Sequence, residues 1–419
     1  MLSEKILVYL LFITPFASAH AQFAARAQKN TLDYFIEQSL NNSPLLKEYR
    51  GQIASLSLDS QLIRASLKPQ VNGISANSYA PVIRGFGYDN AISNGAQVSG
   101  LLSVSKSLSS AHSISARIQS LQIQSLSAGN TIRISEQDLR RIVTDQYIIA
   151  YGEQLQLGFN EQINELLRRE DTLLKKLTQN NVYKQTDYLA FVVTLQQQLL
   201  NASQLEIQYS IDYAALNYLA GANDTSSVIL IDPKLNIRSR EELSATIFYR
   251  QFVLDSLKLV NDRSLIDINY RPSAGLFADA GYNSSLAYRP YKNFGTSAGI
   301  NIIVPIYDGK QRKLQYSKIS IQERARLDKK DFFMQQQRQQ VMQLLQQLHS
   351  TDKLIEQVDR QIKYTETLIA VNEKLLPTGD IRLTDFILSL NNYLNAKNLV
   401  TQHYVSRLKI LNQLNYWSE

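Results

Sequence analysis

Side chains that enzymes use for nucleophilic or acid–base chemistry are sparse in this sequence. The chain has no Cys and only four His among 419 residues. Three of them, His112, His349 and His403, stand on helical stretches with no acidic or nucleophilic partner nearby in sequence. Isolated imidazoles neither form a catalytic triad nor supply the several ligands of a metal site. We therefore expect no catalytic residue, no metal and no cofactor, in a protein that is not an enzyme.

The polar residues with the most suggestive spacing are two Thr-Asp dipeptides at matched positions. Thr186-Asp187 follows Asn181, and Thr384-Asp385 follows Gly379 at the same spacing. Gly and Asn accept left-handed backbone conformations, so each marks a break between two helical stretches. In one interpretation each Thr caps the restarted helix through its hydroxyl, and each Asp is favoured by the helix N-terminus. In the other, the carboxylates belong to a functional site.

The elements that position these dipeptides occur twice along the chain. A helical stretch of roughly seventy residues, about 100 Å long, precedes each break, from Ser109 to Thr178 and from Asp308 to Leu376. Earlier in each half a helix closes before Pro69 or Pro272, because proline disfavours helical geometry in the preceding residue. This order indicates an internal duplication with a period of about 200 residues. We expect the repeats to form one integrated protomer, with boundaries at residues 22–222 and 223–419.

Between each proline and the following long helix, the sequence predicts two short strands joined by a turn-rich loop. The fourth run alternates most clearly, with apolar residues at every second position from Ala298 to Ile306. The third run, Ser273 to Tyr282, and the second, Val98 to Ser105, alternate too, whereas the first, Val71 to Ala80, is ragged. Four strands suit a membrane barrel but cannot close one, so several copies would have to share it. The alternative is a soluble sheet covering the end of a helical bundle.

The N-terminus has the pattern of an export signal. An apolar stretch from Ile6 to Phe16 follows Lys5 and precedes the small residues of Ala19-His20-Ala21. We expect a signal peptide over residues 1–21 and a mature chain from Gln22, with a retained N-terminal anchor as the alternative. The chain carries 44 Lys+Arg against 37 Asp+Glu, for a formal net charge of +7. The Lys and Arg residues are dispersed among Asp and Glu and form no run of like charge, which argues against nucleic acid as a partner.

From about Leu32 to Trp417 the pattern resembles the TolC family of outer-membrane channel proteins. The segment from Pro305 to Arg312 is similar to the family's Pro-hydrophobic-aromatic-Asp-Gly-Gly-x-Arg sequence, where the last strand becomes a helix. Here Lys310 replaces the second Gly. The predicted strand–helix junctions are Pro69, Pro272, Pro305 and Gly309.

The resemblance implies a fold that is mainly α with a small β part. A duplicated, long α-helical barrel would continue into a transmembrane β-barrel with four strands per protomer and twelve in a homotrimer. The duct would sit in the outer membrane of a Gram-negative type envelope, contact outer-membrane lipid and extend its helices into the periplasm. A periplasmic adaptor and an inner-membrane pump of the RND or ABC type would be its partners. It would passively conduct substrates in tripartite efflux or type I secretion.

The resemblance also assigns the two breaks to the periplasmic entrance. It places Asp385, next to Thr384, in a ring of three carboxylates, with Arg382 as a candidate counter-charge. Opening is expected to swing the second hairpin outward as links among Asp187, Tyr183 and Arg382 loosen. The hairpin tips, which would contact the adaptor, are predicted at Asn180, Asn181, Val182, Thr378, Gly379 and Asp380.

Three positions at the entrance depart from the family pattern. Asn181 stands where the family has Gly, which Asn can replace because it also visits left-handed geometry. Leu388 stands where a second acidic residue is expected. The family's basic residue two positions after the Gly is Ile381 here, and Arg382 lies one place later.

A second class of protein also fits part of the pattern. A non-conducting periplasmic or surface coiled-coil scaffold explains the long helices and the duplication. It leaves the paired alternating strands unexplained. The two hypotheses differ in extraction, because a scaffold should leave a membrane with salt or alkali, whereas a barrel should need detergent.

Overall fold

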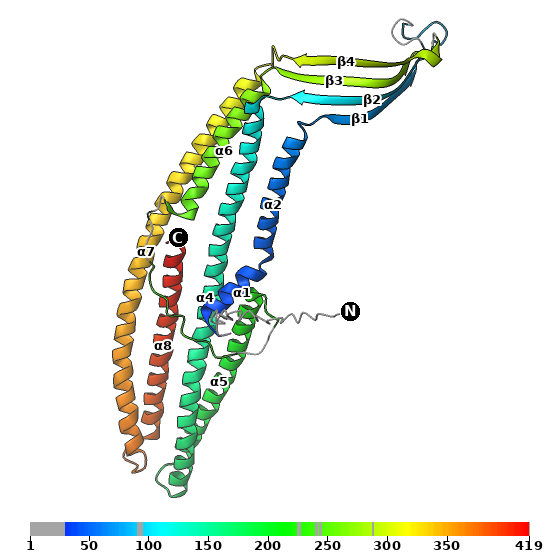
Figure 1. Cartoon of the computed structure of the whole chain (residues 1–419). Coiled ribbons are helices and arrows are strands. Elements are labelled where there is room, and N and C mark those ends of the chain that lie inside the picture. Colours follow the sequence, from blue (N-terminus) through cyan, green and yellow to red (C-terminus); the bar gives the residue numbers. More distant parts are fainter. Residues whose placement is uncertain are drawn as a thin grey trace, which may run out of the picture.

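The computed structural model describes residues 30–89, 95–223, 228–238, 242, 245–286 and 289–418 of the chain. The predicted signal peptide lies outside these residues. The molecule is elongated, with a sheet at one end and long helices that run from it to two hairpin turns at the other end (Figure 1).

Long helices make up most of the described chain. In the first half, α4 is followed after a short turn by α5, and in the second half α7 is followed by α8 (Figure 1). The predicted seventy-residue helices are therefore confirmed to within about three residues at each end. The helices are α1 (Leu32–Asn42), α2 (Pro44–Ala65), α4 (Ala111–Gln179), α5 (Gln185–Ala220), α6 (Ile247–Asn269), α7 (Gln311–Leu375) and α8 (Leu383–Tyr416).

Local capping explains where several helices begin and end. The hydroxyls of Ser43, Ser110 and Thr246 accept backbone N–H groups at the starts of α2, α4 and α6. These side chains satisfy donors that the first helical turn leaves unpaired. At the other end of α5, Gly221 has a φ of 67°, the left-handed conformation that commonly ends a helix.

Four antiparallel strands form one sheet in the order β1-β2-β3-β4. The fourth strand is shorter than the alternation predicts, because it ends at Ile303 and not at Ile306. Pro305 has no N–H to donate and is poorly suited to continue the ladder. The strands are β1 (Gln70–Tyr79), β2 (Ala96–Leu108), β3 (Ser273–Ser284) and β4 (Phe294–Ile303).

The register sorts the sheet into two chemically different faces, because directly paired residues point to the same side. The apolar face carries Val71, Val98, Leu102, Val104, Ala274, Leu276, Ala278, Ala280, Ala298, Ile300 and Ile302, although Ser75, Asn77, Lys106 and Thr296 share it. The polar face carries Asn72, Gln97, Ser99, Ser103, Ser105, Asp279, Ser297 and Asn301, although Ile74, Leu101, Phe277 and Ile303 share it. The alternation predicted in the last three runs is therefore confirmed as a common apolar face.

Buried clusters lie at the middle of the molecule, which we call the waist, along the α7–α8 pair and at the hairpin ends. At the waist, Phe35 and Tyr147 are fully buried among helices α1, α4, α5 and α8. The Tyr147 hydroxyl lies 2.8 Å from the carbonyl oxygen of Asn30 and 2.5 Å from that of Ile231, so it fixes the segment 228–238 across the helices. Among the described residues, no helix combines the length and apolar character needed to cross a bilayer.

Candidate functional site at the hairpin ends

Both helical breaks lie at the end of the molecule far from the sheet (Figure 1). We name residues 180–184 the first turn and residues 376–382 the second turn. Asn181 has a φ of 63° and Gly379 a φ of 76°, so both adopt the left-handed conformation. A Cβ atom on Gly379 would lie 2.9 Å from Cγ1 of Val182, which places the two turns in contact.

Tyr183 ties the first turn to both ends of the second. Its side chain is buried, at 8% exposure, and its hydroxyl donates toward the carbonyl oxygens of Leu376, at 2.9 Å, and Ile381, at 3.1 Å. Burial raises the pKa of the Tyr183 phenol, and the nearby charge of Asp380 adds to this increase. The hydroxyl therefore stays a neutral donor at ordinary pH. We call this contact the tyrosine latch.

An apolar cluster and a polar link continue the contact between the two hairpins above the latch. Fully buried Phe191, Leu376 and Phe386 belong to one cluster that draws on α4, α5, α7 and α8. Arg169 of α4 donates to Glu373 of α7 at 3.2 Å. That ion pair is largely exposed, so burial of the apolar cluster contributes most of the stabilisation.

The acidic residues predicted for the entrance lie in the first turns of the restarted helices. Asp187 is partly buried in α5, and Asp385 is exposed in α8. Both positions favour a negative charge because the helix dipole is positive there. In the described part of the chain, the side chains of Asp187, Asp385 and Arg382 make no hydrogen bond or ion pair within the protomer. The Tyr183 hydroxyl donates to backbone carbonyls of the second turn and not to these charged side chains.

The interpretation of Thr186 and Thr384 as helix caps is wrong. The helices start earlier than predicted, so Thr186 and Thr384 are the second residues of α5 and α8. Lys184 and Arg382 hold the cap positions, and neither helix has a side-chain cap hydrogen bond. The hydroxyl of a residue already inside the first turn is not placed to accept the N–H groups that a cap satisfies.

The remaining residues predicted for the tips are exposed. Asn180, Asn181 and Val182 lie on the first turn, and Thr378, Gly379 and Asp380 lie on the second. Val182 is 42% exposed, which leaves an apolar side chain at the surface of the tip.

The acceptors of the latch could not be predicted from the sequence. Every residue carries a main-chain carbonyl, so the residue type gives no signal.

The prolines and the glycine predicted for the strand–helix junctions lie at the opposite end. Pro69 and Pro272 directly precede β1 and β3, and Pro305 follows β4. Before α7, Gly309 has a φ of 63° and Lys310 a φ of 71°, so the position where the family has its second Gly is also left-handed here. Three hydrogen bonds hold this junction. Asp308 accepts the N–H groups of Lys310 and Arg312, and the Arg312 side chain donates to Asp267 at 2.6 Å.

Solved structures of outer-membrane proteins match this architecture over nearly the whole chain. VceC, an outer membrane protein of Vibrio cholerae, has a TM-score of 0.73 at 11% identity and covers 92% of this chain and 96% of its own. The outer-membrane channel OprN has a TM-score of 0.71 at 14% identity, over 93% of this chain and 90% of its own. The MtrE outer membrane channel of Neisseria gonorrhoeae, in its open state, has a TM-score of 0.71 at 12% identity, over 93% of this chain and 88% of its own. No protein-family model and no curated protein matches the sequence.

The chain therefore has the fold of the TolC-type outer-membrane channels. This confirms the fold class that the sequence resemblance implies. Within the described residues, no group of three or more His, Asp or Glu side chains is placed to hold a metal ion.

Proposed function

We propose that this protein is one protomer of a homotrimeric duct in the outer membrane, with its helices in the periplasm. The two-faced sheet carries the proposal. Its edge strands β1 and β4 each have one partner among the described strands. Lipid does not tolerate open sheet edges, so an apolar face turned to lipid requires other copies to close the barrel. Three copies supply twelve strands, with the polar face lining a lumen.

An exposed apolar stripe on α5 supports side-by-side packing of copies. Its members recur at steps of four and seven residues, which keeps them on one side of the helix, opposite the buried face. We name this set the α5 stripe: Leu189 (52% exposed), Val193 (68%), Leu200 (53%), Ile207 (63%), Ile211 (56%) and Tyr218 (83%). A single protomer leaves this apolar surface uncovered, and a neighbouring copy would bury it.

The likeness in fold to VceC, OprN and MtrE supports a channel role. On this proposal the duct serves tripartite efflux or type I secretion, and an adaptor meets the exposed tips of the two turns. An inner-membrane pump of the RND or ABC type supplies the energy. The protein itself needs no catalytic residue, because conduction through an open duct is passive.

The entrance is gated by separation of the two turns. Opening releases the tyrosine latch, so that the second hairpin swings away from the first. The charged residues Asp187, Arg382 and Asp385 are left to interact between copies around the threefold axis. Three Asp385 carboxylates in one ring attract cations and repel each other.

The test of the duct combines assembly with conduction. We expect the purified protein to require detergent for extraction, to run as a trimer and to form ion-conducting pores in planar bilayers. The double substitution Val193→Glu and Ile207→Glu should yield monomers, because charges on the α5 stripe would be buried between copies. Ser210→Glu adds a charge to the same helix away from the stripe and should leave trimers intact.

The competing scaffold hypothesis predicts a different outcome. A protein that leaves membranes with alkali and forms no pores would contradict the duct and favour the scaffold. Trimers and pores that persist in the Val193→Glu and Ile207→Glu variant would instead refute only the role of the stripe.

A further inference from the structure

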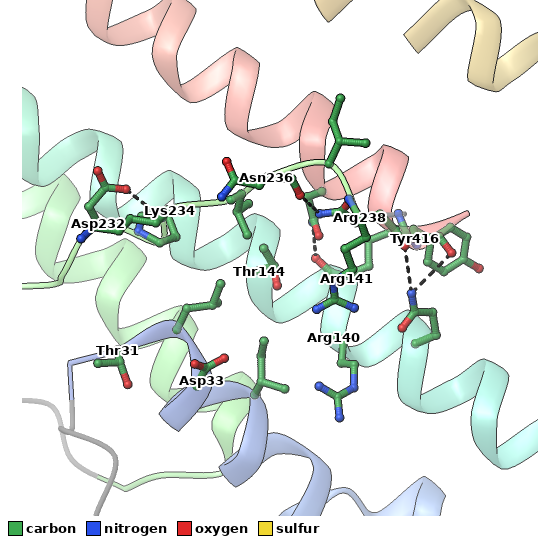
Figure 2. Close-up of a pocket in the computed structure, with 18 of the residues that line it drawn as sticks. Thr31, Asp33, Arg140, Arg141, Thr144, Asp232, Lys234, Asn236, Arg238 and Tyr416 are labelled. Carbon is green, nitrogen blue, oxygen red and sulfur yellow. Dashed lines mark hydrogen bonds between the residues drawn. The ribbon is translucent and has the colours of Figure 1, made fainter. Parts of the chain in front are cut away.

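A basic cavity at the waist is separate from both the sheet and the hairpin turns. It has a volume of about 510 Å³ and lies between α1, α4, the end of α8 and the segment 231–238 (Figure 2). This volume exceeds that of a single ion and suits a small organic ligand. The charged side chains lining it are Asp33, Arg140, Arg141, Asp232, Lys234 and Arg238.

Positive charge dominates this cavity, with four basic side chains against two acidic ones. One of the two carboxylates is already engaged. Asp232 accepts the Tyr404 hydroxyl at 3.1 and 3.2 Å and the backbone N–H of Lys234 at 2.9 Å. These contacts leave the negative charge of Asp232 in place, so the two carboxylates offset two of the four positive charges and the lining keeps an excess of positive charge.

Three of the basic side chains, those of Arg140, Arg141 and Lys234, retain unused donors. Arg140 and Lys234 are exposed, and in the described part of the chain neither side chain makes an ion pair or a hydrogen bond. Arg141 lies 3.9 Å from Asp138 and 4.9 Å from the centre of the Tyr416 ring, yet its buried Nε atom has no hydrogen-bond partner. Figure 2 shows Arg140, Arg141 and Thr144 on adjoining turns of α4 beside the cavity.

We propose that this cavity binds a small anionic ligand bearing a carboxylate or a phosphate group. Arg140 and Arg141 supply planar guanidinium groups, which match both oxyanions in a two-pronged hydrogen-bonding geometry. Lys234, on the connecting segment beside Asp232, adds a point charge to the lining (Figure 2). The site lies midway along the helices and so could be occupied in the assembled protein without blocking the turns (Figure 1). The proposal is independent of conduction.

The test is a titration of the full mature protein in detergent at low ionic strength. Inorganic phosphate and succinate are the two probes. Binding of phosphate is measured by phosphorus NMR line widths and by calorimetry, and binding of succinate by calorimetry. We expect saturable binding of at least one probe, and the probe that binds identifies the preferred oxyanion. Arg140→Gln and Lys234→Gln, tested singly, should each weaken binding about tenfold, the loss expected for one charge-assisted hydrogen bond.

Arg133→Gln is the matched control, because Arg133 is exposed on the same face of α4, seven residues away, and does not line the cavity. It removes the same charge and should leave the affinity unchanged. Absence of saturable binding of both probes to the unmodified protein would overturn the proposal. So would equal weakening by Arg133→Gln and Arg140→Gln, which would indicate a diffuse effect of net charge. Pore formation, measured separately, distinguishes this failure from failure of the duct.

Discussion

At the scale of single residues, Tyr183 has the best-defined role at the hairpin ends. Its ring is buried between the two turns, while its hydroxyl reaches main-chain oxygens at both ends of the second turn. A main-chain acceptor cannot be lost by a change of side chain. The latch therefore depends on one residue of the first turn and on the backbone shape of the second.

Tyr183→Phe should loosen the contact between the two turns. The substitution keeps the ring but removes the phenolic donor to the carbonyls of Leu376 and Ile381, at a cost of about 1–3 kcal/mol, and among the described residues the Leu376 carbonyl keeps only the N–H of Gly379, at 3.3 Å. We expect faster proteolysis at residues 376–382 and a higher single-channel conductance. Tyr364→Phe is the control, because Tyr364 is 78% exposed on α7 and should be neutral. Unchanged proteolysis and conductance in Tyr183→Phe would contradict the latch.

The latch should also weaken in alkali. The folded protein raises the pKa of Tyr183 above its ordinary value of about 10, first through burial and then through Asp380. The folded state thus holds the proton more tightly than the unfolded state does. The resulting stabilisation is complete below about pH 10 and falls as pH rises from there through the raised pKa.

Thermal unfolding of the wild type and of Tyr183→Phe, followed by circular dichroism across this range, provides the measurement. The other buried tyrosines titrate in both proteins, so the difference in melting temperature isolates Tyr183. We expect this difference to shrink with rising pH. A difference that stays constant would mean that the phenol does not titrate with the hairpin contact.

At the scale of elements, the second turn depends on Gly379. An alanine there would adopt the left-handed conformation at a cost of about 1–2 kcal/mol in stability. Its Cβ atom would also press on Val182. Gly379→Ala should lower the melting temperature and separate the turns, and the added change Val182→Ala should relieve only the steric part. Gly158→Ala is the control, because a Cβ there meets nothing within 4 Å and should stabilise α4. A Gly379→Ala protein as stable as the wild type would refute this assignment.

Most elements could be predicted because their signals are local. Pro69 and Pro272 mark the ends of helical stretches, and Asn181 and Gly379 mark the breaks between the paired helices. The alternation places the end of β4 too late, because it continues through Ile306, although Pro305 has no N–H to donate to the ladder.

Contacts between distant segments could not be predicted in the same way. The latch joins residues 193 positions or more apart through main-chain oxygens, which leave no trace in residue type. The basic cavity is also assembled from α1, α4, α8 and a connecting segment, so its residues look like ordinary dispersed charges in sequence.

At the scale of the whole molecule, the two faces of the sheet should respond oppositely to added charge. Ala298 and Ser297 are neighbours at mid-strand, but Ala298 pairs with Ala278 on the apolar face and Ser297 with Asp279 on the polar face. Ala298→Lys should cost about 2–4 kcal/mol per subunit in lipid and reduce membrane insertion. Ser297→Lys should insert normally, because its amine meets water and Asp279.

Alkaline extraction of membranes and heat-dependent gel mobility would measure insertion of the two variants. Normal insertion of both would show that Ala298 does not face lipid. Defective insertion of Ser297→Lys alone would reverse the assignment of the two faces.

The helices of one protomer can pack without a partner, but its sheet cannot pair both edges alone, and this difference has a consequence for biogenesis. Each protomer can bury Phe35, Tyr147 and Phe191 alone in water, whereas its four strands cannot satisfy both edges without other chains. Helical hairpins should therefore mature first, and the barrel should form last in a single concerted step. If three chains must meet for that step, its rate rises with the cube of protomer concentration. For the proposed duct, a modest fall in expression would then cause a disproportionate shortage of finished pores and leave unassembled subunits exposed to periplasmic proteases.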